Sequence, residues 1–339
     1  MSRRATILAL CVLLGLAGAC AQQEQATDPA EEAFGVLRAA WSEAETSEAK
    51  TKLAEDYLAQ FPDTEHSGSM AGAIVYYRGN DLEDPEGAYE IVSATLERIE
   101  SPDQRFEVSM ELLSLSDSVD VPLDIARVAN DLSAVRPLTF NEHQWVAETA
   151  TDFEEWMVAD EHALAASELA TPEIYRADYA DREFTDEEVA SRVQRRKALS
   201  LAYDGWALYN LGDTELAFTR FAESDEIGSV SYLGVPNTPL YTFWGRAALA
   251  AGDFDRAVEL LGAETLFGED GSGAEAYLRE AYVAKNGDDE DFDEFLWSTR
   301  NELAATVSDF ELADYDGNPV SLSDVGDGKV MLLAFWFPT

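Results

Sequence analysis

The 339-residue chain carries 67 acidic and 23 basic side chains, a formal net charge of −44, and 46% of its residues are apolar. The length predicts about two domains, and the apolar share is large enough to fill a core despite the charge. A nucleic-acid binder needs an excess of Lys and Arg, so the composition excludes that class, and it also excludes electrostatic adhesion to an anionic lipid surface. Such acidity favours solubility in a salty environment and does not specify a fold.

The first nineteen residues have the parts of an export signal. Arg3 and Arg4 form a positive n-region, residues 7–16 an apolar stretch, and residues 17–19 a small-residue cleavage site. The apolar stretch is too short for an ordinary membrane-spanning helix. Residues 1–19 are therefore expected to be a signal peptide, with an uncleaved anchor as the alternative.

Small residues directly before Cys20 resemble the lipobox of bacterial lipoproteins, although Leu16 lies one position earlier than the usual leucine. The resemblance implies that Cys20 is diacylated and anchors the protein in the membrane of the bacterial cell envelope, facing the periplasm; two or three acyl chains anchor stably. Ala21, which replaces an acidic residue, favours the outer membrane. Residues 20–33 would then be the lipidated cysteine and a polar tether. Since Cys11 would leave with the signal, no free thiol or disulfide is expected in the mature chain.

Residues 34–305 have the punctuation of helices. A side-chain oxygen at the N-cap followed by Pro at the first helical position is expected at Asp84-Pro85, Ser101-Pro102, Thr171-Pro172 and Thr238-Pro239. Ser101–Gln104 and Thr185–Glu188 also match capping boxes. Apolar residues recur at helical spacing, and no strand pattern precedes residue 306. The prediction is a mainly α protein, with a helical domain over 34–195 and helical repeats over 196–305.

Two segments within residues 198–300 have matching small and apolar positions. These are Gly205, Trp206, Tyr209, Leu211, Gly212, Ala217 and Phe221 in the first, and Gly245, Ala248, Gly252, Ala257 and Leu261 in the second. The pattern resembles tetratricopeptide repeats, with a degenerate third unit over 276–299 and an enlarged loop over 230–238. In such repeats a small residue lets paired helices approach, a glycine ends the first helix, and an alanine packs at the crossing.

A tetratricopeptide-like array implies a concave surface that binds a peptide or a partner protein; the alternative is a scaffold that spaces the next domain. The aromatic residues Trp206, Tyr209, Tyr241, Phe243 and Trp244 do not decide between the two, because aromatics at helical spacing are usually core.

The helices offer few candidates for chemistry, and no cofactor or metal is expected. His66, His143 and His162 lack the spacing that places two ligands on one helical face; His66 is expected in a loop and the others on polar faces. Residues 288–294 lack the glycine of an EF-hand loop and are expected to begin a helix with negative charge. The basic run 192–197 is expected to be a solvated face, and no pair of carboxylates stands out.

After Thr306 the pattern changes to strands. Residues 310–312 and 319–322 flank a turn and predict a hairpin, and the apolar run 329–336 predicts a strand buried on both faces. The matching positions are Asp309, Phe310, Leu312, Asp314, Gly317, Val320, Ser321, Leu322, Ser323, Asp324, Gly328, Lys329, Met331–Leu333, Phe335 and Trp336. They resemble the opening of the thioredoxin fold in the AhpC/TSA and TlpA/ResA-like families.

The resemblance implies that residues 306–339 begin an α/β thioredoxin-like domain with thiol-disulfide oxidoreductase or peroxiredoxin-like activity, served by a thiol reductant. In these families three residues separate Phe-Trp from the nucleophilic cysteine. The nucleophile is thus expected directly after Thr339, flanked by Trp336, Phe337, Pro338 and Thr339. The 339 residues hold no catalytic residue, and the chain alone is predicted to be inactive.

A UGA codon for selenocysteine after Thr339 is one explanation, because a selenol is deprotonated at neutral pH as a redox nucleophile requires. Truncation, a frameshift or a fragmented assembly are the others. A second function remains open: a non-catalytic helical-repeat lipoprotein that binds or scaffolds a partner in the envelope.

Overall fold

The computed structural model describes residues 28–118, 124–228, 239–268, 273–303, 309–313 and 318–323. Over these ranges the chain is mainly helical, as predicted, and no strand precedes Glu311. The chain divides into two compact units, one of residues 1–229 and 238–243, the other of residues 230–237 and 244–339. The predicted signal peptide, Cys20 and most of the predicted tether lie outside the described residues.

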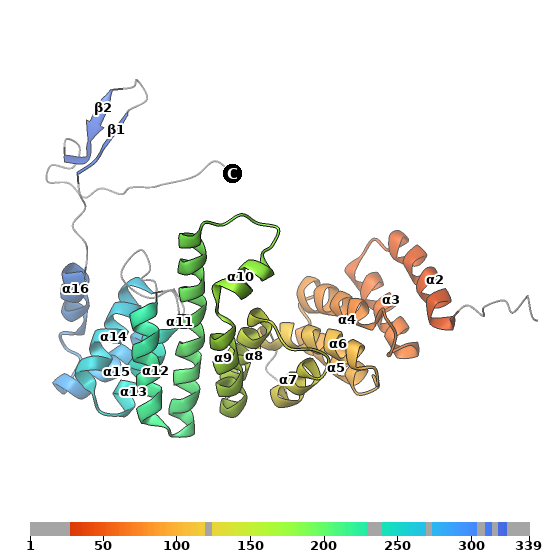
Figure 1. The fold of residues 1–339 in the computed structure, drawn as a ribbon, viewed down its shortest axis with the longest axis horizontal. Helices are drawn as coiled ribbons and strands as arrows, with labels where there is room; N and C mark the ends of the chain where they lie inside the picture. The colour runs from red at the N-terminus through yellow and green to blue at the C-terminus, as the bar shows by residue number, and fades with distance from the viewer. Residues whose placement is uncertain are drawn as a thin grey trace, which may run out of the picture. The chain divides into compact units, whose positions relative to one another are not determined.

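The first unit is built from helices joined by short connections (Figure 1). They are α2 (Pro29–Glu43), α3 (Ser47–Gln60), α4 (Ser67–Ile74), the π-helix η1 (Val75–Asp81), α5 (Pro85–Leu96), α6 (Pro102–Ser114), the 3-10 turn η2 (Ser116–Ser118), α7 (Ile125–Ser133), α8 (Phe140–Asp152), α9 (Trp156–Leu169), α10 (Pro172–Asp178), α11 (Asp186–Leu211) and α12 (Thr214–Ile227). Helix α13 (Leu240–Ala250) begins in this unit and ends in the second.

Several helix starts follow the predicted N-caps. Asp84 accepts a hydrogen bond from the Gly87 N–H, and Thr171 accepts one from the Ile174 N–H. The predicted capping box of Thr185 and Glu188 is confirmed, because both reciprocal hydrogen bonds form. Thr139 and Glu142 form a second box at the start of α8.

Two predictions about helix starts are wrong. Pro102 begins α6, but the side chain of Ser101 makes no cap hydrogen bond, so the predicted box with Gln104 does not form. Helix α2 begins at Pro29, inside the predicted tether, since Asp28 accepts a hydrogen bond from the Ala30 N–H and the proline is set for the first helical position. Thr238 lies outside the described residues.

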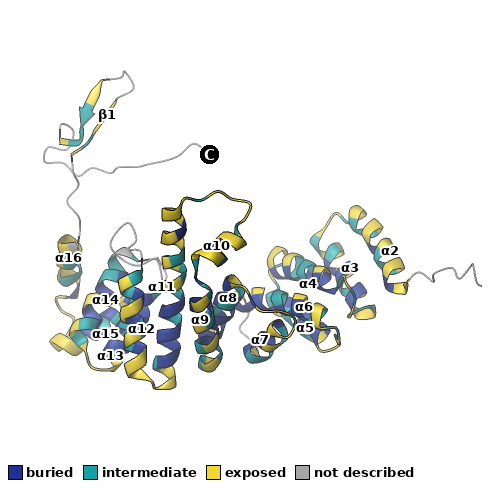
Figure 2. Cartoon of the chain, viewed as in Figure 1, coloured by how far each residue is buried: buried dark blue, intermediate teal, exposed yellow. Residues whose placement is uncertain are grey.

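The core of the first unit runs from Leu37 on α2 to Ala159 on α9. Figure 2 shows that the buried residues gather on the faces where helices meet, whereas α10 is largely exposed. The 26-residue helix α11 packs against both α9 and α12. A long helix held by two neighbours is the element on which buried side chains from separate parts of the chain can converge.

Two helical pairs, α11–α12 and α13–α14 (Phe254–Phe267), share the same local geometry. Gly212 and Gly252 have φ angles of 93° and 80°, a left-handed conformation that glycine adopts without strain and that ends each first helix. The next residue is an aspartate in both pairs. Asp213 accepts from the Leu216 N–H and Asp253 from the Arg256 N–H, so each aspartate caps the second helix.

The helices of each pair approach closely at a glycine. A Cβ on Gly205 would lie 2.7 Å from the Phe221 ring, and one on Gly245 would lie 2.5 Å from Leu261 Cγ. Ala217 and Ala257 are fully buried. These positions have the local roles that their spacing predicted.

The second unit contains the rest of α13 together with α14, α15 (Ala274–Asn286) and α16 (Phe292–Leu303). Helix α14 contacts both α15 and α16, and Phe292 is buried in their shared core. Strands β1 (Glu311–Ala313) and β2 (Pro319–Ser321) pair antiparallel, with Leu312 opposite Val320. The predicted hairpin is thus confirmed, and the predicted strand 329–336 lies outside the described residues.

Candidate functional site

The residues that the sequence assigns to a site are outside the part of the chain that the structure describes. This holds for the lipidation residue Cys20 and for Trp336, Phe337, Pro338 and Thr339 beside the expected nucleophile. The geometry therefore bears on the hairpin that precedes them and on clusters of charged and aromatic side chains in the helices.

Asp309 and Ser323 close the β1–β2 hairpin. The Ser323 N–H donates to Asp309 Oδ1 at 2.9 Å, and the Ser323 hydroxyl donates to Oδ2 at 2.7 Å. The Leu322 N–H donates to the Phe310 carbonyl at 2.9 Å. Hydrogen bonds from the hydroxyl and N–H of Ser323 favour the carboxylate and hold the pKa of Asp309 below its ordinary value. Two positions of the sequence motif thus have a direct structural role.

The aromatic residues around Trp206 form core contacts. The Trp206 ring stacks on Phe243 with centroids 5.1 Å apart and on Tyr209 at 5.7 Å, and it meets Trp156 edge-on. Trp206 and Phe243 are buried. The cluster joins α9, α11 and α13 and does not present an open aromatic surface. Tyr241 donates a hydrogen bond from its hydroxyl to Asp225 Oδ1 at 3.0 Å.

A buried acid, Asp204, lies beside this aromatic cluster on α11. Its carboxyl group is hydrogen-bonded to that of Asp160 on α9, and Arg220 Nε on α12 lies 2.8 Å from Asp204 Oδ2 as an ion pair. Two carboxyl groups can share a hydrogen bond only when one of them carries a proton. Burial, and then the contact with Asp160, raises the pKa of Asp204 to about 7, against the smaller opposing effect of Arg220.

His143 and His162 face each other between α8 and α9, with their Nδ1 atoms 3.1 Å apart. The prediction that His162 lies on a polar helix face is wrong, since its side chain is buried. Burial, together with the neighbouring ring, lowers the pKa of His162 to about 4, and burial also lowers the pKa of His143. The two rings are therefore neutral near pH 7, one donating and the other accepting the hydrogen bond.

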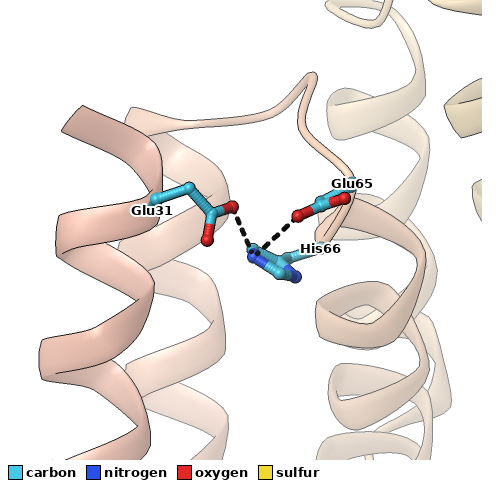
Figure 3. A group of neighbouring side chains, drawn as sticks. All are labelled: Glu31, Glu65 and His66. Carbon is cyan, nitrogen blue, oxygen red and sulfur yellow. Dashed lines mark hydrogen bonds and ion pairs between the residues drawn. The ribbon is translucent and has the colours of Figure 1, made fainter. Parts of the chain in front are cut away.

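A third cluster joins Glu31 on α2 with Glu65 and His66 at the start of α4 (Figure 3). His66 Nε2 lies 2.9 Å from Glu31 Oε1 and 3.8 Å from Glu65 Oε1. One donor atom from each residue lies within 4.8 Å of the other two. Among the residues described, this is the one group of three or more potential ligands that could hold a metal ion.

The segment that carries His66 is fixed by neighbouring hydrogen bonds. The Thr64 N–H donates to Ser67 Oγ at 2.9 Å, and the Ser67 hydroxyl donates to the Pro62 carbonyl at 2.6 Å. Tyr57 Oη lies 3.2 Å from Thr64 Oγ1. Burial, and to a lesser degree the negative charges of Glu31, Asp28 and Glu65, raises the pKa of Tyr57, which marks this corner as electronegative.

The two charged runs differ in outcome. Residues 288–294 lead into α16, with acidic side chains in its first turn, as predicted. The basic run is only partly solvated. Arg196 is nearly buried, pairs with Asp178 at 3.0 Å and lies over the Phe140 and Tyr175 rings. The prediction of a solvated face is wrong for Arg196, because a guanidinium group can stack on aromatic rings while it pairs with an acid.

No protein-family model matches this chain, and no curated protein is similar enough to count as a match. Among the described helices, none combines the length and the apolar character that crossing a membrane requires.

Proposed function

We propose that this chain belongs to a lipid-anchored envelope protein of the thiol-disulfide oxidoreductase or peroxiredoxin-like class. The observation that carries the proposal is the Asp309–Ser323 closure of the hairpin. Both residues are positions of the AhpC/TSA and TlpA/ResA-like pattern, and the paired strands lie where that pattern expects them. The continuing match from Gly328 to Trp336 supports the same assignment.

In this proposal the helices hold the redox domain near its partners in the envelope, and Cys20 carries the lipid anchor. The nucleophile, a cysteine or selenocysteine, would follow Thr339, and a thiol reductant would regenerate it. An attacking thiolate or selenolate must be ionised at the working pH, which favours selenocysteine.

The gene beyond the Thr339 codon provides the test. The expected result is a UGA codon, or a cysteine codon, followed in frame by a resolving cysteine and the rest of a thioredoxin fold. The extended product should reduce insulin disulfides or a peroxide, whereas the 339-residue chain should not. A different stop codon without an in-frame continuation, or activity of the 339-residue chain above background, would overturn the proposal.

A second candidate is a non-catalytic helical-repeat lipoprotein that binds a protein or peptide partner. The glycine contacts Gly205–Phe221 and Gly245–Leu261 favour it, because close approach at a small residue is how tetratricopeptide-like pairs stack. A pull-down of one identified envelope partner can separate the two candidates. Equal capture by the full chain and by a chain that ends near residue 305 supports the binding function, and loss of capture on truncation argues against it.

A further inference from the structure

We propose that Glu31, Glu65 and His66 bind a divalent first-row metal ion of the zinc type. This site is independent of the redox proposal, and the sequence gave no spacing that predicts it. Zinc–nitrogen and zinc–oxygen bonds are about 2.1 Å long, so donors in a tetrahedral site lie about 3.4 Å apart. The distances from His66 Nε2 to Glu31 Oε1 and Glu65 Oε1, 2.9 and 3.8 Å, lie on either side of that value.

The histidine ring is held in the orientation that a metal ligand needs. It stacks on the Phe34 ring with centroids 3.4 Å apart and planes 10° from parallel, and Nε2 points toward both acids (Figure 3). The hydrogen bonds of Thr64 and Ser67 fix the backbone just before it. A ligand whose rotamer is already fixed loses little conformational entropy on binding a metal.

The carboxylates leave the site open to solvent. The Glu31 and Glu65 side chains are 46% and 74% exposed, whereas His66 is 17% exposed. An ion can therefore enter, and water can complete the coordination that three protein ligands leave open.

The ligand set selects the class of metal. Imidazole favours zinc and its neighbours over calcium and magnesium, which prefer oxygen ligands, and the absence of a thiolate disfavours copper(I). Two carboxylates with a neutral imidazole balance the charge of a divalent ion. The negative charge of Asp28 also reaches this corner.

The test is a calorimetric titration of the full chain with Zn²⁺, together with the visible absorption of Co²⁺ as a probe of coordination. His66→Phe keeps a ring that can stack on Phe34 and removes the nitrogen ligand. Glu31→Gln removes one charged ligand and keeps the side chain's size. Each variant is expected to weaken the one-site Zn²⁺ affinity by at least about tenfold and to abolish the Co²⁺ bands.

Glu32→Gln is the matched control, since Glu32 is an exposed acid on the same helical turn. It should leave both signals unchanged, and circular dichroism in the presence of a chelator should show that each variant folds. Equal Zn²⁺ affinity in the wild-type chain and in Glu31→Gln would overturn the proposal. So would equal loss in Glu32→Gln, because either result assigns the binding to the acidic surface in general.

Discussion

Gly205 lies directly against the ring of Phe221, so that a Cβ at position 205 would come within 2.7 Å of Cε1. Phe221 is fully buried, and its ring cannot swing into solvent to make room. The contact between α11 and α12 is therefore built around the absence of a side chain at one position. Gly245 and Leu261 repeat the arrangement in the second unit.

Gly205→Ala is expected to destabilise the first unit by about 1–3 kcal/mol, because overpacking a tight core forces the ring or the backbone to shift. Gly35→Ala on α2 is the control, since no atom lies within 4 Å of the added methyl group there. Alanine is the better helix former, so the control should be neutral or stabilising by up to about 1 kcal/mol. Urea unfolding followed by circular dichroism measures both, and equal midpoints would contradict the packing argument.

The capping boxes give a second prediction. Thr185→Ala removes a side chain that accepts the Glu188 N–H and is itself bonded to the Glu188 carboxylate. The expected loss is about 1 kcal/mol. Ser101→Ala should cost much less, because Ser101 occupies an N-cap without making the cap hydrogen bond. Denaturant midpoints of the two variants test this, and an equal loss at both positions would show that cap geometry is not the cause.

The helices could be predicted from the sequence because their signals are local. Asp84, Thr171 and Thr185 each lie within three residues of the backbone N–H that they cap. The left-handed glycines 212 and 252 likewise end helices through their own backbone preference. Ser101 shows the limit of such signals, since a suitable residue type does not fix its rotamer.

The charged clusters could not be predicted, because their partners are brought together by tertiary packing. Glu31 and His66 belong to different helices, and Asp204 meets Asp160 and Arg220 only when α9, α11 and α12 pack. His162 carries no local mark of burial, and its contact with His143 depends on how α8 meets α9. Residue type indicates the chemistry that a side chain can perform, and the fold decides which side chains are neighbours.

Asp309→Ala is expected to loosen the hairpin. The Ser323 N–H and hydroxyl would both lose their acceptor, so the Ser323 amide should exchange faster with solvent deuterium. Because the folded pKa of Asp309 is depressed, the wild-type contact should persist at neutral pH and be lost as the pH falls through that pKa. Glu311→Gln on β1 is the control. Unchanged Ser323 exchange in Asp309→Ala would show that the carboxylate does not close the hairpin.

Asp204 predicts how the stability of the first unit depends on pH. Its folded pKa of about 7 lies above the ordinary value of 3.8, so the folded state holds this proton to higher pH than the unfolded state does. The stabilisation is complete below about pH 4 and is lost as the pH rises through about 7. Between pH 5 and pH 8 the wild-type chain should lose on the order of 2 kcal/mol from this group.

Asp204→Asn tests the assignment, because an amide stays neutral at every pH and can still hydrogen-bond to Asp160. The free energy of unfolding, measured at pH 5 and pH 8, should change less between the two conditions in Asp204→Asn than in the wild-type chain. Glu215→Gln removes an exposed carboxylate from α12 and should keep the wild-type difference. If Asp204→Asn kept the full difference, other groups would have to carry the pH dependence, and Asp204 would have to be ionised throughout despite its burial.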